Sequence, residues 1–274
     1  MIIIEYKLLE YLKFIFYGII QGLTEFIPVS STAHLKIISL LFGINEPGSS
    51  FSSIIQIGSV FAILWYFRKK FFNLNFINSK ELRYLFFSKK LYKSIFIGTI
   101  PIVITGGIIK LFFPGFSDSF LRSNLSIALV SILMSLIMLF ADNSTNKFIN
   151  LNNHRFFNSF YIGFAQAFAI IPGVSRSGGT ISMALLSGWE RKDAAIFSFL
   201  LGIPSISIAA FVEFLSAVNQ FSSFPFLPLF VGLITTFFSS LLAIDFLTKY
   251  FSSHGLKIFV YYRLMFGIFI LLNL

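Results

Sequence analysis

The sequence predicts an all-α, polytopic integral membrane protein that forms a single membrane domain over residues 1–274. Hydrophobic residues make up 56% of the chain and charged residues 12%, which is too little charged surface for a soluble domain of this length. Several apolar runs approach or exceed the roughly 20 residues that a helix needs to cross a bilayer. The net charge of +10 indicates basic cytoplasmic loops, and in so apolar a chain it argues against nucleic acid as a partner.

The predicted helices follow the apolar runs. The first run, residues 8–27, ends before Pro28, because the residue before a proline avoids the helical region. The N-terminus lacks the features of a cleaved secretory signal, so this run is expected to be retained. After it we expect a short helix at 33–43, a turn at 46–50, spans at 51–67, 94–113 (ending before a Pro114-Gly115 turn) and 124–141, an interrupted region at 158–188, and spans at 194–218, 226–248 and 258–274.

A basic segment lies between the predicted spans 51–67 and 94–113. Residues 68–93 contain eight basic side chains and one acidic side chain, Glu81. The positive-inside rule therefore predicts that this loop is cytoplasmic.

The two interrupted regions correspond to each other along the chain. An offset of 145 residues aligns identical residues of both regions: Gly18 with Gly163, Gln21 with Gln166, Val29 with Val174, and Ser30 with Ser175. Interrupted apolar segments in corresponding halves are typical of inverted-repeat membrane proteins with a central site. The sequence thus predicts two pseudo-repeats, about 1–141 and 158–274, each with a re-entrant helix-loop-helix element.

The second interrupted region, residues 171–180, has the composition of an anion site. Small residues let the backbone approach a ligand, and a helix restarting near Thr180 would offer free N–H groups. Arg176 adds a fork of donors that fits phosphate. Serine and glycine could instead serve close helix packing, but packing does not account for an arginine among them.

The first interrupted region contains candidate catalytic groups. Gln21 and Glu25 share a helix face, and Glu25 stands at a helix end where the dipole disfavours a carboxylate. Glu25 is therefore a candidate ligand for a divalent cation, and the alternative is an ion pair with Arg176 alone. Ser31 and His34 are three residues apart, as a nucleophile and its base could be. The alternative for His34 is a polar contact with a neighbouring helix.

Together these residues form a set suited to phosphoryl transfer, which needs positioning and charge neutralisation above all. No nucleotide-binding loop accompanies them, so ATP coupling is unsupported.

Residues 21–34 and 172–180 resemble the motifs of the undecaprenyl-diphosphate phosphatases, the bacitracin-resistance family of bacterial membranes, and residues 55–58 and 194–204 support the match. The resemblance implies hydrolysis of undecaprenyl diphosphate to undecaprenyl phosphate and inorganic phosphate. This recycles the lipid carrier for peptidoglycan synthesis, cell-wall biogenesis and cell shape, and confers bacitracin resistance. It also implies a divalent cation, Mg²⁺ or Ca²⁺, and a multi-pass protein of the cytoplasmic (inner) membrane with its site facing outward. The implied partners are the polyprenyl diphosphate substrate, membrane lipids and, as a candidate, a second copy of the chain in a homodimer.

The resemblance also implies residue roles. The catalytic residues would be Glu25, Ser31 and His34; the phosphate-binding residues Ser30, Thr32, Ser175, Arg176, Ser177 and Thr180; and the metal ligands Glu25 and Gln21. Gln21 departs from the family, because many members have a glutamate there. Ala33 replaces a common glycine, which indicates that this position does not need a positive φ.

Two rival functions arise from the same features. Broken helices in inverted repeats also build transporters, so the phosphate site could serve a lipid-phosphate flippase. The pairing of Ser31 with His34 favours an enzyme, in which His34 could also activate water directly. The phosphatidic-acid-phosphatase pattern is excluded, because the next histidine after Arg176 is His254.

Overall fold

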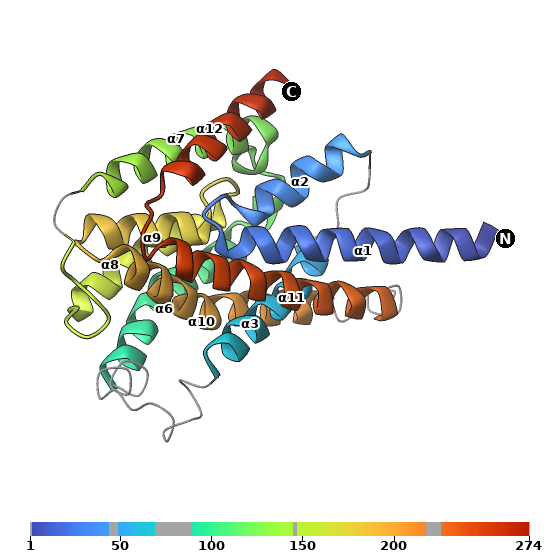
Figure 1. Ribbon diagram of the computed structural model, residues 1–274. Coiled ribbons are helices and arrows are strands. Elements are labelled where there is room, and N and C mark those ends of the chain that lie inside the picture. The colour runs from blue at the N-terminus through green and yellow to red at the C-terminus, as the bar shows by residue number, and fades with distance from the viewer. Residues whose placement is uncertain (1, 44–48, 69–88, 145–146, 218–225, 274) are drawn as a thin grey trace.

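The apolar runs fold into helices in the computed structural model, which describes residues 2–43, 49–68, 89–144, 147–217 and 226–273. Figure 1 shows the arrangement. The α-helices are α1 (Ile2–Phe26), α2 (Ser31–Leu41), α3 (Ser49–Tyr66), α6 (Lys89–Phe112), α7 (Asn124–Asp142), α8 (Phe156–Ala167), α9 (Arg176–Leu186), α10 (Arg191–Ala217), α11 (Phe226–Tyr250) and α12 (Lys257–Leu272). Three short 3-10 helices are η1 (Pro114–Asp118), η2 (Phe120–Arg122) and η3 (Phe168–Ile170). Within the described ranges the only extended pairing is one isolated bridge, between Ile149 and Trp189.

Several helices begin earlier than the apolar pattern predicts. The second interrupted region restarts at Arg176 and not near Thr180, and α2 starts at Ser31 and not at residue 33. Ser49 and Ser50 belong to α3, so they are not part of the predicted turn at 46–50, whose residues 46–48 lie outside the described part of the chain. A first helical turn keeps free N–H groups and tolerates polar side chains, so hydropathy alone does not locate it.

The basic segment is partly helical. Lys89, Lys90 and Lys93 belong to the start of α6, and residues 69–88 of the predicted loop lie outside the described residues. The turn expected at Pro114-Gly115 forms the start of η1.

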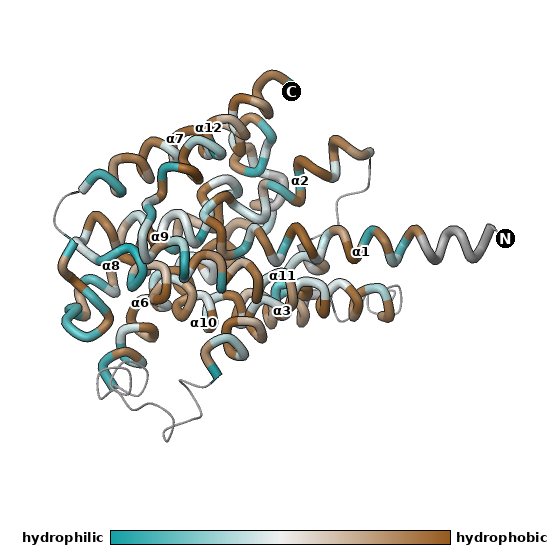
Figure 2. Tube along the Cα trace, in the orientation of Figure 1, coloured by the Kyte–Doolittle hydropathy of each residue, from teal (hydrophilic) through white to brown (hydrophobic). Residues whose placement is uncertain are grey.

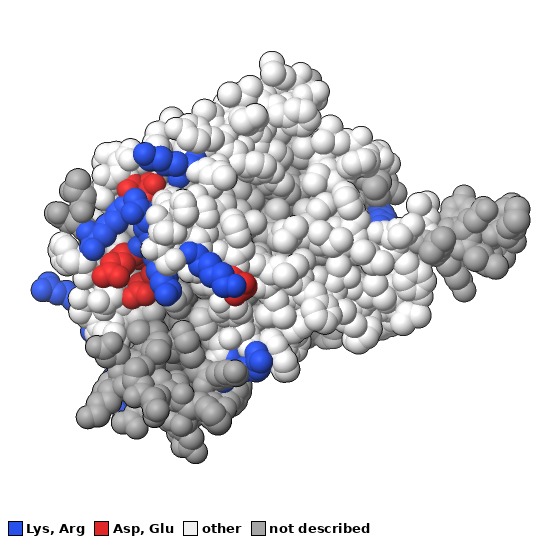
Figure 3. All heavy atoms as spheres, in the orientation of Figure 1, with Lys and Arg blue, Asp and Glu red and all other residues white. Residues whose placement is uncertain are grey.

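The surface confirms the predicted class, an all-α multi-pass membrane protein. Four described helices are long and apolar enough to cross a membrane: Lys89–Phe112, Asn124–Asp142, Arg191–Leu215 and Phe226–Tyr250. Large apolar side chains such as Phe96, Leu242 and Met265 are exposed along them and along α12. In the view of Figures 2 and 3, hydrophilic segments and charged side chains gather mainly at one end of the molecule, and the rest of that face is almost free of charge.

Helices from the two halves of the chain pack against each other. Helix α1 lies along α11, α8 packs on α6, and α7 packs on α12 (Figure 1). Glycines permit the first two contacts: a Cβ on Gly18 would lie 2.6 Å from the Gly232 carbonyl oxygen, and one on Gly163 would lie 2.1 Å from that of Gly98. Gly18 and Gly163 are aligned by the offset of 145 residues. Packing of helices from one half of the chain against helices of the other half is what an inverted repeat would give. The repeat boundaries, 1–141 and 158–274, stay a prediction.

Both helix interruptions have the same local geometry. Helix α1 ends at Phe26 and η3 ends at Ile170, and in each case the next α-helix begins directly after a serine. Ser30 has φ +76° and Ser175 has φ +70°, and among the described residues they are the only non-glycine residues with positive φ. Ala33 lies inside α2, which confirms that its position needs no positive φ.

Candidate active site

The two interrupted regions contact each other directly. The Gly173 N–H donates to Ser30 Oγ at 3.2 Å, and Ser177 Oγ donates to the Ile27 carbonyl oxygen, also at 3.2 Å. All four residues lie within three residues of a helix end, where backbone groups are left without helical partners. The candidate residues predicted from two distant stretches of sequence are therefore brought together.

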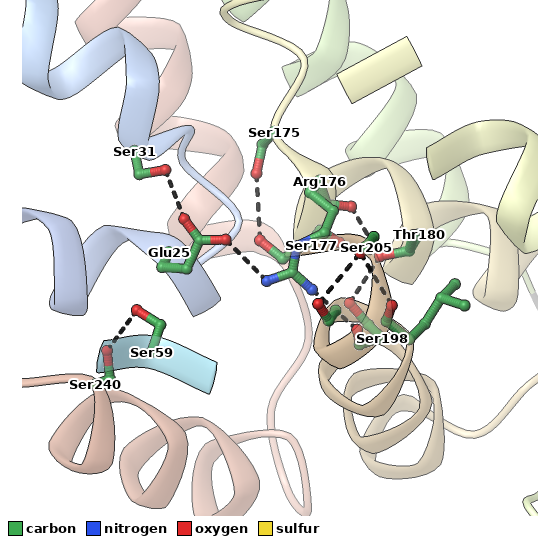
Figure 4. A network of polar contacts seen from close by, with 12 residues as sticks. Glu25, Ser31, Ser59, Ser175, Arg176, Ser177, Thr180, Ser198, Ser205 and Ser240 are labelled. Carbon is green, nitrogen blue, oxygen red and sulfur yellow. Dashed lines mark hydrogen bonds and ion pairs between the residues drawn. The ribbon is translucent and has the colours of Figure 1, made fainter. Parts of the chain in front are cut away.

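Glu25 connects the two interrupted regions in the polar network drawn in Figure 4, where dashed lines join it to Ser31 and to Arg176. Its Oε1 lies 3.0 Å from Arg176 Nη2, and its Oε2 accepts hydrogen bonds from Ser31 Oγ at 2.9 Å and Gln21 Nε2 at 2.7 Å. The Glu25 side chain is 7% exposed and that of Arg176 9% exposed. The ion pair considered from the sequence is thus formed, and the same carboxylate also accepts from the Ser31 hydroxyl.

One edge of the Arg176 guanidinium faces the Glu25 carboxylate. Nη1 donates to the Ser198 carbonyl oxygen at 3.0 Å, which holds the far side of the group. Nε is buried and has no hydrogen-bond partner in the part of the chain that the structure describes. The edge formed by Nε and Nη2 is one that can bind a phosphate with two parallel bonds, and among the described residues its hydrogen-bond partner is Glu25.

The hydroxyl groups of the second loop are mostly used within the protein. Ser175 Oγ accepts from the Gly178 N–H at 3.1 Å and so caps α9, and it lies 3.2 Å from Ser177 Oγ. Thr180 Oγ1 donates to the Arg176 carbonyl oxygen at 2.8 Å, lies 2.7 Å from Ser198 Oγ, and is fully buried. Because α9 starts at Arg176, Thr180 lies one turn inside the helix and not at its N-terminus.

In the first loop the two remaining hydroxyls differ in exposure. Ser30 is buried, whereas Thr32 is exposed on α2, with its Oγ1 3.3 Å from Ser30 Oγ. The phosphate-binding roles predicted for all these hydroxyls stay predictions.

His34 is held by α12 and makes no hydrogen bond to Ser31. Its Nδ1 donates to the Ser30 carbonyl oxygen at 2.8 Å, so in the neutral ring Nε2 accepts from the Tyr262 hydroxyl at 2.6 Å. The ring stacks on Phe266, with centroids 4.3 Å apart. The pairing of Ser31 with His34 is therefore not formed, because the hydroxyl bonds to Glu25 and both ring nitrogens are engaged elsewhere. His34 makes the helix-bridging contact that was the alternative interpretation, and its catalytic role stays a prediction.

The sequence reasoning missed two residues of α12 that support the site. Tyr262 contacts His34, and Arg263, which is fully buried, donates to the backbone carbonyls of Pro28 and Gly173. A signal was present, because Arg263 is the only charged residue in the apolar span 258–274, and a charge at membrane depth indicates function.

The oxygen atoms around Glu25 show how a divalent cation could be held. Gln21 Oε1 is buried and has no partner among the described residues, and it belongs to the amide that contacts Glu25. No group of three or more His, Cys, Asp or Glu residues occurs in the described ranges. Two protein oxygens fit a Mg²⁺-type ion that is held mostly by substrate phosphates and water, and they do not make a complete protein cage.

Comparisons with known proteins agree on one family. Residues 14–269 match the family model described as bacitracin resistance protein BacA. A protein named undecaprenyl-diphosphatase from Prochlorococcus marinus subsp. pastoris is 79% identical over 97% of this chain and 100% of its own length. Proteins of the same name from strains AS9601 and MIT 9313 are 67% and 45% identical, over 98% and 93% of this chain and 98% and 86% of their own lengths.

Proposed function

Because the chain belongs to the bacitracin resistance protein family, we propose that it hydrolyses undecaprenyl diphosphate to undecaprenyl phosphate and inorganic phosphate. The observation that carries the proposal is the contact of Ser31, Glu25 and Arg176, three groups from two loops, at one buried point. The reaction returns the lipid carrier to peptidoglycan synthesis and removes the diphosphate form that bacitracin sequesters.

Ser31 is the proposed nucleophile. Its Oγ attacks the terminal phosphorus, and the bond from that phosphorus to the bridging oxygen breaks, so that undecaprenyl phosphate leaves. Glu25 Oε2, 2.9 Å away, is placed to accept the Ser31 proton. Water then hydrolyses the phosphoserine and releases inorganic phosphate. Direct attack by water is the alternative, with no bond formed to Ser31.

Arg176 is proposed to exchange partners when substrate arrives. A terminal phosphate that takes the Nε and Nη2 edge replaces Glu25 there, while Ser198 continues to hold Nη1. The exchange supplies charge-assisted bonds to the phosphate and frees Glu25 from its cationic partner. Glu25 Oε1, released in this way, would be available to the cation proposed below, while Oε2 stays beside the Ser31 hydroxyl.

His34 is proposed to act from its place beneath the first loop. Its Nδ1–H bond to the Ser30 carbonyl oxygen, which can only accept, sets the tautomer and holds the residue directly before Ser31, and Nε2 accepts from the Tyr262 hydroxyl. A role as base for water would require Nε2 to leave Tyr262.

A divalent cation, Mg²⁺ or Ca²⁺, is proposed as the cofactor. Glu25 and Gln21 Oε1 would hold it, and it would neutralise charge on the diphosphate. The glutamine can supply a carbonyl oxygen but cannot act as a second base.

The proposed setting is the bacterial inner membrane, with the site open toward the outer side and the basic segment in the cytoplasm. That the protein forms a homodimer stays a prediction, which a measurement of its molecular mass in detergent would test. The lipid-phosphate flippase is not favoured, because the relatives are named for a phosphatase.

The test is phosphate release from undecaprenyl diphosphate by purified protein in detergent, with Mg²⁺, Ca²⁺ or a chelator. Arg176→Ala and His34→Ala should each abolish release, and near-normal turnover in either variant would remove the role given to that residue. A parallel liposome assay of lipid flipping separates the rival: flipping without phosphate release would overturn the proposed reaction.

A further inference from the structure

Arg263 of α12 is a charged side chain with no place in the proposed chemistry. It is 0% exposed and ranks among the largest fully buried side chains of the described residues. No carboxylate of the described residues forms an ion pair with it. A buried guanidinium without a counterion is expensive at membrane depth, so its hydrogen bonds need an explanation.

Its two terminal nitrogens bind one carbonyl oxygen in each loop. Nη1 donates to the Pro28 carbonyl oxygen at 3.2 Å, and Nη2 donates to the Gly173 carbonyl oxygen. Pro28 and Gly173 are 145 residues apart, the same offset that aligns Ser30 with Ser175. One guanidinium therefore holds corresponding backbone positions of the two halves.

These two carbonyls lie just upstream of the site residues in each half of the chain. Each carbonyl lies two residues before a serine of positive φ, and directly after each serine begins the helix that carries site residues. Ser31 begins α2 and Arg176 begins α9, and both meet at Glu25. Fixing the two carbonyls relative to each other thus restricts the distance between the Ser31 hydroxyl and the Arg176 guanidinium.

We propose that Arg263 is a positioning residue that braces the two interrupted loops and so sets the spacing of Ser31, Glu25 and Arg176. The role needs a planar group with two diverging donors, which arginine has and lysine lacks. Gly178, near the start of α9, lies beside the group: a Cβ there would be in ordinary van der Waals contact with Arg263 Nη1, at 3.5 Å. Arg263 acts through the backbone and touches none of the proposed reacting groups.

The kinetic test rests on the proposed hydrolysis. Arg263→Ala should lower kcat about 100-fold, the order of loss that a displacement of about 1 Å can cause, and change KM only a few-fold. Added ethylguanidinium should raise the kcat of Arg263→Ala to at least about a tenth of the wild-type value, while ethylammonium at the same concentration should not raise it. Arg68→Lys, which alters an arginine just after α3 whose side chain contacts Trp65 of that helix, is the control and should leave kcat unchanged.

A second measurement does not depend on any activity. The chain has no cysteine, so spin labels can be placed by Leu40→Cys and Leu186→Cys near the ends of α2 and α9, where both side chains are exposed. Arg263→Lys, which keeps the charge and the aliphatic stem, should broaden the distance distribution between the labels. The control Arg68→Lys should leave the distribution unchanged.

The outcomes separate the inference from the function. A broadened distance with no hydrolysis even in the wild type would retain the brace and reject the phosphatase. Loss of kcat with an unchanged distance would overturn the brace and place Arg263 at the reacting atoms. Normal kcat and an unchanged distance in Arg263→Ala and Arg263→Lys would also overturn the brace, since the guanidinium would then have no effect on the loops. Failure of both variants to fold would overturn it too, since the guanidinium would then stabilise the whole fold and not the spacing of the loops.

Discussion

At the scale of single residues, the site consists of few groups that satisfy one another closely. The carboxylate of Glu25 has three donors, from Ser31, Gln21 and Arg176. An ion pair so well buried is stable only while both charges are present, because a lone charge would lack compensation. The same pair therefore has a structural effect and a chemical one, and the two can be separated by mutation.

Glu25→Gln should abolish phosphate release and also lower the melting temperature in detergent, because it leaves the Arg176 guanidinium buried without a counterion. The double variant Glu25→Gln with Arg176→Gln should recover much of the melting temperature but none of the activity. Recovery of activity in the double variant would show that neither charge takes part in the reaction.

Gly202→Ala should lower phosphate release by about 100-fold with little change in stability. A Cβ at this position of α10 would lie 2.3 Å from Arg176 Nη1, so the guanidinium would have to move. Gly107→Ala in α6 is the matched control, because a Cβ there meets nothing within 4 Å. Equal activities of the two variants would show that the placement of Arg176 is not critical.

At the scale of elements, the two interruptions use the same device. Each loop ends in a serine with positive φ. Ser30 Oγ accepts a hydrogen bond from the Gly173 N–H of the second loop, and Ser175 Oγ accepts one from the Gly178 N–H of α9. Non-glycine residues adopt this conformation at an energetic cost, which the surrounding contacts must offset. Strain of this kind at both loops is typical of sites where backbone must be aimed at a ligand.

Ser175→Gly should keep the fold with a small loss of stability, because glycine adopts positive φ freely and only the cap is lost. Ser175→Val should lose the cap and add strain of about 1–3 kcal/mol. Thermal melting of the two variants checks this order. A valine variant as stable as the glycine variant would show that the loop relaxes to negative φ.

At the scale of the whole molecule, a cluster of polar contacts around Asp142 joins three helices. Asp142, at the end of α7 and 3% exposed, binds Arg191 Nε at 2.7 Å and the Leu256 N–H at 3.0 Å. Lys147 lies 3.6 Å from the same carboxylate. The cluster joins α7 to the starts of α10 and α12, and α12 in turn carries Arg263 to the loops.

Asp142→Asn should reduce the free energy of unfolding by about 1–3 kcal/mol, since charge-assisted bonds to buried groups are lost. Asp245→Asn is the control, because its pair with Lys249 is largely exposed and should contribute less than about 1 kcal/mol. Detergent-based melting distinguishes them. Equal small shifts would mean that the cluster does not hold the helices together.

His154, in the loop before α8, should make stability depend on pH. Burial, and secondarily the charge of Lys90, lowers its pKa from 6.5 to about 4. The folded protein therefore favours the neutral ring, which accepts from Ser94 Oγ at 2.7 Å. This contribution is complete above pH 6.5 and is lost as the pH falls toward 4.

The measurement for His154 is the melting temperature between pH 7 and pH 4. His154→Gln should show a smaller fall over this range than the wild type, because glutamine does not titrate. Identical pH profiles would mean that the ring is not held neutral in the folded state.

The sequence alone determined the membrane class, nearly all the described spans and the two loops, because a bilayer requires long apolar helices and makes every interruption conspicuous. It also identified Glu25, Ser31, His34 and Arg176 as the polar groups of those loops. Helix starts were less accurate, since hydropathy marks where a helix enters lipid and not where its hydrogen bonds begin.

The tertiary structure alone decided which groups are partners. Spacing put Ser31 and His34 on one helix face, but the Ser31 hydroxyl bonds to Glu25 and His34 bonds to Tyr262. Arg263, far along the chain, meets both loops only because α12 packs beside them. Periodicity reports which way a side chain faces on its own helix, whereas contacts at about 3 Å depend on how separate helices are placed against one another.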